Sequence, residues 1–124
     1  MLDTNVYDLV VTRSGFTDRL NRAVEAGHVD VVRTRVQENE IARIQSASRR
    51  AAIRKIRGRT VPTISPPPGP WPSDDTLIAL TAEVSADALV TEDKELRERV
   101  QAASNRLEAW SFAHLVQFID ALPE

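Results

Sequence analysis

Residues 88–93 carry the sequence ALVTED, a short apolar run that ends in polar and acidic side chains. An apolar run of this length, set between helical patterns, predicts a strand buried in a parallel sheet. An acidic residue just after such a strand lies at its carboxyl end, where open α/β sheets bind their ligands. The stretch therefore predicts both the fold class and the edge of the sheet that carries a site.

The rest of the chain continues this alternation of strands and helices. The expected strands are Met1–Tyr7, Val29–Thr34, Ala88–Val90 and Arg106–Trp110. The expected helices run from Thr17 to Gly27, from Val36 to about Ile56, from Ser73 to Ala86, through Leu96 and Val100, and from about Leu115 to Leu122. Strands that alternate with helices predict an α/β fold, here a three-layer α/β/α domain with a central, mainly parallel sheet. Residues 1–124 are short enough to form it as a single domain.

One segment departs from this pattern. Val61–Pro72 holds six of the seven prolines of the chain. Proline cannot continue a helix and cannot donate to a sheet ladder, so this segment predicts a stiff, partly extended connection and not a central strand. A spacer is the simpler interpretation, and the rim of a cleft is the alternative.

The composition is that of an ordinary water-soluble domain. The chain is 42% hydrophobic and 27% charged, which is enough apolar material for one core. The absence of cysteine excludes a disulfide framework, thiolate zinc sites and thiol catalysis. No apolar run approaches the roughly 18 residues of a membrane span, and the start shows no signal-peptide pattern. These features lead us to expect a cytoplasmic protein without membrane contact.

Positive charge is concentrated in one segment, although the net charge is only −2. Residues 33–59 hold nine basic and two acidic side chains, a local charge of +7, and the remainder has a local charge of −9. On the expected helix, the face opposite the apolar stripe carries Arg43, Arg50, Arg54 and Arg57. This face is either simply solvated or binds the phosphates of a nucleic acid.

Four acidic residues fall at strand ends or helix starts on one expected edge of the sheet. They are Asp3, Glu40, Asp75 and Asp93. Carboxylates that converge repel one another unless a cation neutralises them. Ligation by oxygen alone suits Mg²⁺ or Mn²⁺ better than zinc, and the two histidines of the chain do not stand at zinc-ligand spacing. The pattern therefore predicts a magnesium or manganese site.

Each of these acids also has a structural explanation. Asp75 and Asp93 each begin a helix, where a carboxylate can cap the backbone and stabilise the helix dipole. Glu40 could face solvent, and Glu38 is close enough in sequence to take its role. Asp3 is harder to explain in this way, because an unpaired carboxylate is costly where a strand enters the core. The arrangement of all four acids is the signal.

These segments resemble the motifs of PIN-domain nucleases, in the same order along the chain. Residues 2–6, LDTNV, resemble the opening strand motif, and residues 75–82, DTLIALTA, resemble the helix of the third acid. Residues 89–93, LVTED, resemble the strand end of the fourth acid, and residues 36–41, VQENEI, are similar to the region of the second. Family members usually have several apolar residues before the first aspartate, where this sequence has two. The proline-rich segment before the third acid is also longer than expected.

The resemblance implies an endoribonuclease that hydrolyses RNA phosphodiester bonds with Mg²⁺ or Mn²⁺ held by carboxylates. In this sequence Asp3, Asp75 and Asp93 would be the metal ligands. Glu40 would bind the metal, directly or through water, or would orient the nucleophile. All four would be catalytic residues, and the family is commonly homodimeric.

Two further positions and one partner follow from the same resemblance. Asn5 and Thr91 are expected to hydrogen-bond to the carboxylates and hold them in place. Many stand-alone members of this size resemble VapC-like toxins, which pair with a small antitoxin protein. A PIN-type RNA-processing nuclease without an antitoxin is the alternative.

Two other classes of function remain open. Asp3 followed by Thr4 is compatible with an aspartate nucleophile in phosphotransfer, but such sites want a second aspartate two residues later, and position 5 is asparagine. A non-catalytic PIN-like binding module is the third class. The complete set of four acids argues against it, because a degenerate site usually loses some of them.

Overall fold

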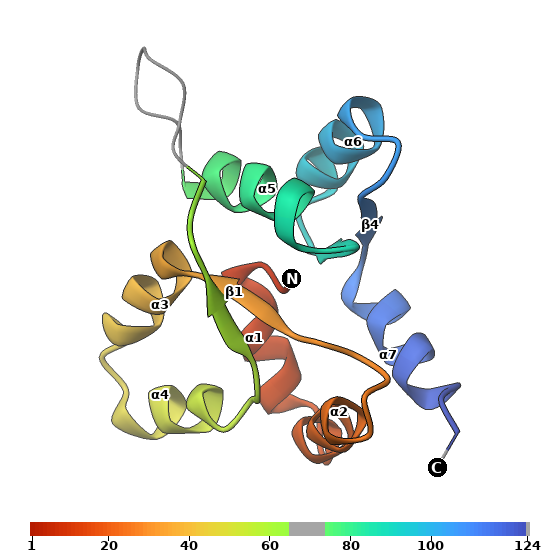
Figure 1. Ribbon diagram of the computed structural model, residues 1–124. Helices are drawn as coiled ribbons and strands as arrows, with labels where there is room; N and C mark the ends of the chain where they lie inside the picture. The colour runs from red at the N-terminus through yellow and green to blue at the C-terminus, as the bar shows by residue number, and fades with distance from the viewer. Residues whose placement is uncertain (65–73, 124) are drawn as a thin grey trace.

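The computed structural model describes residues 1–64 and 74–123, with the side chains of Asp74 and Asp75 left out. Over these residues the fold is mixed α/β, with seven helices and short parallel strands (Figure 1). The helices are α1 Thr4–Thr12, α2 Phe16–Glu25, α3 Arg35–Ala42, α4 Ala47–Arg54, α5 Asp74–Ser85, α6 Lys94–Ala103 and α7 Phe112–Asp120. The strands are β1 Val32–Thr34, β2 Arg59–Val61, β3 Ala88–Val90 and β4 Glu108–Trp110.

The strands pair two by two, and the N-terminal segment lies beside one of the pairs. β1 pairs with β2, and β3 pairs with β4, both in parallel. Leu2 forms a parallel bridge with Val90, in which the Asp3 amide donates to the Val90 carbonyl over 2.8 Å. Among the described residues the strands thus form two small parallel sheets, and one continuous central sheet is not seen.

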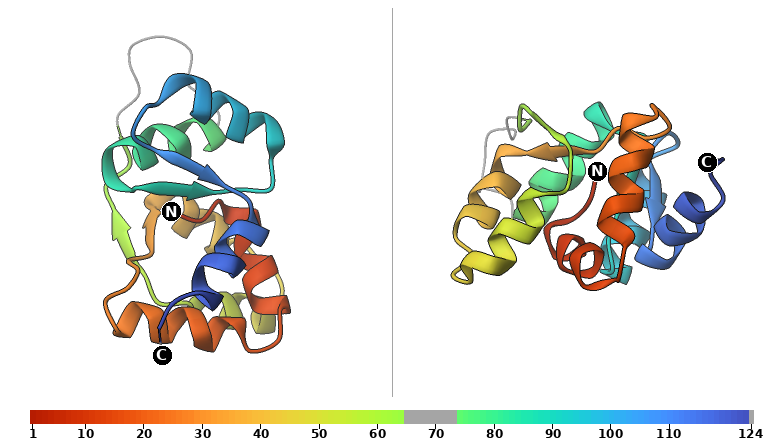
Figure 2. Two further views of the ribbon diagram at one scale, coloured as in Figure 1. Left: turned by 90° about the vertical axis from the view of Figure 1, so that its right-hand side faces the viewer. Right: turned by 90° about the horizontal axis from the view of Figure 1, so that it is seen from below.

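The core is divided between the two faces of the strands. Leu2, Val31 and Val90 join one apolar cluster, which is built mainly from α1, α2 and α7. Their chain neighbours Met1, Val32 and Leu89 join a second cluster with residues of α5 and α6. Consecutive strand residues therefore point to opposite helical groups, as the alternation of a strand requires. Figure 2 shows helices on both sides of the strands, with the N-terminus between the two strand pairs.

The expected first strand over Met1–Tyr7 is wrong beyond residue 3. The chain turns into helix α1 at Thr4, and the carboxylate of Asp3 accepts a hydrogen bond from the Thr4 amide as the N-cap of this helix. Val6 and Val10 then lie one helical turn apart and are both fully buried. A capping aspartate followed by apolar residues at this spacing favours a helix over a strand.

The single helix expected over Val36–Ile56 is also wrong. Helix α3 ends at Ala42, and a second helix, α4, begins at Ala47. Ser46 is the N-cap of α4, and its hydroxyl accepts from the Arg49 amide over 3.2 Å. A serine cap offers the backbone an alternative to helix continuation, which explains the break in an otherwise helical pattern.

The other boundaries differ by smaller amounts. Helix α2 begins at Phe16 after the left-handed Gly15, one residue before the expected cap Thr17. The second strand begins at Val32 and not at Val29. Strand β2, which was not expected, ends at Val61, the first residue of the proline-rich segment. Residues 65–72 of the predicted connection lie outside the described residues. None of the described helices has both the length and the apolar character needed to cross a membrane.

Candidate carboxylate site

Asp3 lies where the N-terminal segment passes the carboxyl end of β3. Its carboxylate is buried, with 7% exposure of the residue, and both oxygens are engaged. Oδ1 accepts from the Thr4 amide over 2.8 Å, and Oδ2 accepts from the Thr91 hydroxyl, also over 2.8 Å. These two donors fix the orientation of the carboxylate.

Thr91 joins two of the predicted acids. It is fully buried, and its amide donates to the carbonyl of Trp110 over 2.9 Å, which extends the pairing of β3 with β4. Its hydroxyl donates to Asp3 and also accepts from the Asp93 amide over 3.1 Å. The Asp93 carboxylate accepts from the Leu96 amide over 3.1 Å and so caps α6. The hydroxyl of Thr91 thus holds Asp3 and the backbone of Asp93 together.

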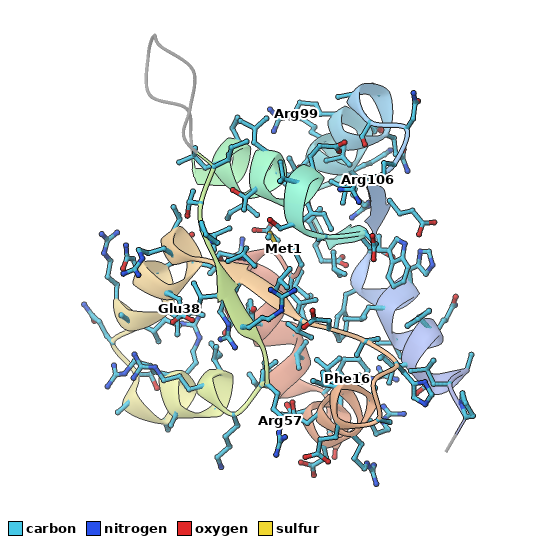
Figure 3. The ribbon with its side chains drawn as sticks, in the orientation of Figure 1. Met1, Phe16, Glu38, Arg57, Arg99 and Arg106 are labelled. Atoms are coloured by element: carbon cyan, nitrogen blue, oxygen red, sulfur yellow. The ribbon has the colours of Figure 1, made fainter. Side chains whose placement is uncertain are left out.

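Glu40 reaches the same edge from helix α3. The hydroxyl of Thr4 donates to Oε1 of Glu40 over 3.2 Å, so the residue that contacts Glu40 directly follows Asp3 in the chain. Glu38 lies elsewhere: Oε1 is 3.5 Å from Nε of Arg33 and accepts from the Thr60 hydroxyl over 2.9 Å. Figure 3 shows Glu38 beside the β1–β2 pair. The two glutamates therefore contact different parts of the fold, and Glu40 is the one near Asp3.

Gln37 holds α3 against the N-terminal segment, and the sequence analysis missed it. Its backbone and side chain form a capping box with Thr34, and its side-chain amide donates to the carbonyl of Leu2. Gln37 is fully buried. The threonine followed three residues later by glutamine is the sequence signal of a capping box and could have identified it. Thr4 gave no such signal, because its contact with Glu40 depends on the tertiary position of α3.

The other predicted site residues are not brought together in this way. Asp75 stands in the first turn of α5, but its side chain lies outside the described residues. Asn5 is exposed on α1, and no hydrogen bond to Asp3 or Glu40 is seen for it in the described part of the chain. Among the described side chains, no three acidic or histidine groups gather closely enough to hold a metal ion. Asp75 is not one of these side chains.

The predicted basic face is divided by the break between α3 and α4. Arg43 directly follows α3, Arg50 and Arg54 lie on α4, and Arg57 lies beyond its end. Arg50 donates to the carbonyl of Ile44 over 2.6 Å and thereby binds the connection between the helices. Arg43 and Arg54 are exposed, and no ion pair is found for them among the described residues.

Four basic side chains of residues 33–59 are already paired with acids: Arg33 with Glu38, Arg59 with Asp30, and Arg49 and Arg57 with acids of the first two helices. Arg57 lies 2.7 Å from a carboxylate oxygen of Glu25 on α2. Arg49 donates to both oxygens of Asp8 on α1, over 2.6 Å each, and this bond raises the pKa of Arg49. The last two pairs connect α4 and its end to the first two helices and reduce the charge available to a phosphate ligand.

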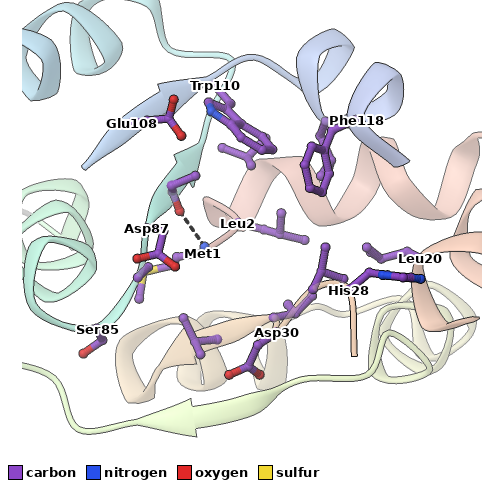
Figure 4. Close-up of a pocket in the computed structure, with 17 residues that line it drawn as sticks. Met1, Leu2, Leu20, His28, Asp30, Ser85, Asp87, Glu108, Trp110 and Phe118 are labelled. Atoms are coloured by element: carbon purple, nitrogen blue, oxygen red, sulfur yellow. Dashed lines mark hydrogen bonds between the residues drawn. The ribbon is translucent and has the colours of Figure 1, made fainter. Parts of the chain in front are cut away.

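A separate cavity of about 370 Å³ lies at the amino ends of the strands, opposite the carboxylates (Figure 4). It is lined mainly by apolar side chains from the segments before β1 and β3 and from α7. The Met1 amine donates to the carbonyl of Ala88 over 2.7 Å there. Burial lowers the pKa of this amine to about 6, and the charges of Asp87 and Asp30 partly oppose the shift. Among the described side chains, none of the predicted site residues lines this cavity.

Comparison of the chain with protein-family models, with curated proteins and with solved structures gave no significant match.

Proposed function

We propose that this protein is a Mg²⁺- or Mn²⁺-dependent endoribonuclease that hydrolyses phosphodiester bonds at the edge formed by Asp3, Glu40, Asp75 and Asp93. The observation that carries this proposal is the hydrogen-bonded chain from Glu40 through Thr4 to Asp3 and on through Thr91 to Asp93. It links residues separated by up to ninety positions in sequence. Asp3, Thr91 and Asp93 lie at the carboxyl end of β3, where α/β folds bind ligands, and Glu40 approaches them from α3.

The arrangement of the core supports the finer assignment of the fold. Consecutive residues of the N-terminal segment, β1 and β3 point to opposite helical groups. A three-layer PIN-like domain, in which the N-terminal segment is the central strand, has this alternation. We propose that architecture, with Leu2 as the residue that joins the N-terminal segment to β3.

The groups that would bind the metal suit a hard cation such as Mg²⁺ or Mn²⁺. The groups at this edge are carboxylate oxygens, and the described part of the site contains neither sulfur nor imidazole. Asp3 is buried and held by two donors, so it cannot turn away from a cation at little cost. Asp3, Asp75 and Asp93 would hold the ion, with Glu40 as a direct or water-mediated partner.

The residues of the chain then have separate tasks. When bound, the cation would lower the pKa of a water ligand and stabilise charge on the phosphate oxygens. Thr91 keeps Asp3 and the Asp93 backbone in fixed relation, and Thr4 does the same for Asp3 and Glu40. Glu40 would accept a proton from the attacking water or orient it. Of the four predicted RNA-binding arginines, exposed Arg43 and Arg54 are best able to bind RNA phosphates, because Arg50 binds a carbonyl and Arg57 pairs with Glu25.

The biological role stays a prediction of the resemblance. We propose a toxin of the VapC-like type with a small antitoxin partner, and a homodimer as its assembled form. An RNA-processing nuclease of the same chemistry is the alternative. Co-purification of the chain with the product of an adjacent small gene would separate the two.

The metal requirement is the first test. Purified protein should cleave single-stranded RNA with Mg²⁺ or Mn²⁺, lose this activity in EDTA and regain it when the metal is restored. Asp93→Asn should lose cleavage and keep the fold, because asparagine is also a good N-cap for α6. Cleavage that continues unchanged in chelator would overturn the proposal.

Asp87→Asn is the matched control for Asp93→Asn. The two aspartates stand on opposite sides of β3, Asp87 before its amino end and Asp93 after its carboxyl end. Asp87 is exposed and pairs only weakly with Arg106, over 3.4 Å. The Asp87 variant should retain full cleavage. Equal loss in both variants would mean that charge in general, and not this site, supports the activity.

A further inference from the structure

Arg97 of helix α6 holds the corner between β3 and α6, residues 91–93. Its Nη1 donates to the carbonyl of Thr91 over 2.5 Å, and its own backbone amide donates to the carbonyl of Asp93 over 3.0 Å. The side chain is half-buried. One residue thus binds both ends of a three-residue corner.

The corner that Arg97 holds is the one that positions the carboxylates. Thr91 contacts Asp3 through its hydroxyl and receives the Asp93 amide on the same oxygen. A rotation of the peptide after Thr91 would shift the Asp93 amide relative to this hydroxyl and so remove the donor that helps to orient the hydroxyl toward Asp3. The bond from Arg97 to the Thr91 carbonyl opposes such a rotation, because that carbonyl belongs to the peptide that links Thr91 to the next residue of the corner.

We propose that Arg97 is a positioning residue of the carboxylate site, which acts through Thr91 and not through its charge. This proposal rests on the function proposed above. The two modes of action predict opposite changes in cation affinity when Arg97 is replaced. Loss of a positioning bond weakens cation binding, since residues that orient metal ligands typically contribute 10- to 100-fold in affinity. Loss of a positive charge near carboxylates strengthens cation binding, because less repulsion opposes the ion.

The contacts of Arg97 favour a role through its hydrogen bond over a role through its charge. In the described part of the chain Arg97 makes no ion pair with a carboxylate, whereas its hydrogen bond to Thr91 is short. Arg99 is a matched control on the same helix: it is exposed and carries the same charge. Figure 3 shows Arg99 on the outer side of α6.

The test compares Arg97→Met, Arg97→Lys and Arg99→Met. Methionine keeps much of the apolar stem but removes the hydrogen-bond donor and the positive charge. Lysine keeps the donor and the charge. We expect Mn²⁺ affinity, measured by electron paramagnetic resonance, to fall roughly 10-fold in Arg97→Met and to recover largely in Arg97→Lys. Arg99→Met should bind Mn²⁺ as well as the wild type or slightly better. Unchanged or tighter binding by Arg97→Met would overturn the positioning role.

Amide hydrogen exchange provides a readout that needs neither metal nor RNA. The Asp93 amide, which donates to Thr91, should exchange faster in Arg97→Met than in Arg97→Lys or Arg99→Met. If the wild type binds no Mn²⁺ and cleaves no RNA, the proposed function fails, and the exchange rates alone decide whether Arg97 holds the corner. Equal exchange at Asp93 in all variants would overturn the inference about Arg97, whatever the protein cleaves.

Discussion

Tyr7 is the only tyrosine of the chain and lies fully buried on α1. Burial raises the pKa of its hydroxyl to about 12, with a smaller opposing effect from the charge of Arg33. Between about pH 10 and 12 the unfolded chain loses this proton and the folded chain keeps it, so the free energy of unfolding falls as the pH rises. A shift of two units corresponds to about 2.7 kcal/mol.

Tyr7→Phe should lack this alkaline loss of stability. Urea unfolding of both proteins at several pH values measures the difference, and groups that titrate in both chains cancel. The ultraviolet absorbance of ionised tyrosine reports the same transition directly, since no second tyrosine contributes. Equal pH dependence in the two proteins would contradict the burial of this hydroxyl.

Glu38 and Glu40 offer a second residue-scale test. Glu40→Gln should lower RNA cleavage at least about 10-fold, because Glu40 accepts from the Thr4 hydroxyl beside Asp3. Glutamine keeps an acceptor oxygen for that hydroxyl, so we expect little change in stability. Glu38→Gln should keep cleavage but lower the free energy of unfolding by about 1–3 kcal/mol, since the buried Arg33 loses its charged partner. Cleavage assays and thermal unfolding of both variants check this. The reverse pattern would make Glu38 the second acid of the site.

At the scale of elements, the exposed arginines and the ion-paired arginines of residues 33–59 should contribute unequally to RNA binding. Arg43 and Arg54 are exposed and without ion pairs among the described residues, whereas Arg57 pairs with Glu25. Each phosphate contact with single-stranded RNA adds roughly −0.7 to the slope of log affinity against log salt. Replacing both Arg43 and Arg54 by alanine should therefore flatten this slope by about 1.4.

Arg57→Ala is the control for that pair, and it should change the slope by less than one contact. Affinity measured across a salt series, with a catalytically inactive Asp93→Asn background, separates binding from cleavage. An unchanged slope in the double variant, together with altered sedimentation, would mean that this surface binds a protein partner and that RNA enters elsewhere.

The elements also show what periodicity can and cannot predict. Ala88–Val90 was predicted with its observed bounds, because a short apolar run between helical patterns has few alternatives. The break between α3 and α4 was missed, because Ile41 and Ile56, which a single helix would place on one face, are both buried. The signal was local: Ser46 caps α4, and a cap overrides the pattern of the apolar residues around it.

The site could be predicted only in part, because the order of elements predicts which segments meet but not which side chains bind the backbone there. Asp3 and Thr91 belong to segments that meet at one sheet edge, so the order of elements was enough to bring them near each other. Arg97 could not be predicted, because a side chain that binds a backbone carbonyl six residues away leaves no mark in a pattern of acids. Asp3 was placed on a strand, yet it caps a helix, and that local role is compatible with a ligand role.

At the scale of the whole molecule, the proposed cation should stabilise the fold, because its ligands come from segments far apart in sequence. Asp3, Glu40 and Asp93 stand on the N-terminal segment, α3 and the corner before α6, and they approach one another only in the folded chain. A ligand that binds only the folded state adds about 2.7 kcal/mol when its concentration is 100 times its Kd. For a chain of this length that corresponds to a rise in Tm of about 10 °C.

We therefore expect Mg²⁺ or Mn²⁺ to raise the Tm of the wild type and to leave Asp3→Asn nearly unchanged. Without metal, Asp3→Asn loses one repulsive charge but leaves the Thr91 hydroxyl without its carboxylate acceptor, so its Tm should lie close to that of the wild type. Differential scanning calorimetry in EDTA and in saturating metal measures both effects. Asp87→Asn should respond to metal like the wild type, because Asp87 lies at the amino end of β3. A metal-induced rise of equal size in Asp3→Asn would show that the cation binds elsewhere, and the carboxylate edge would then have to be explained by helix capping alone.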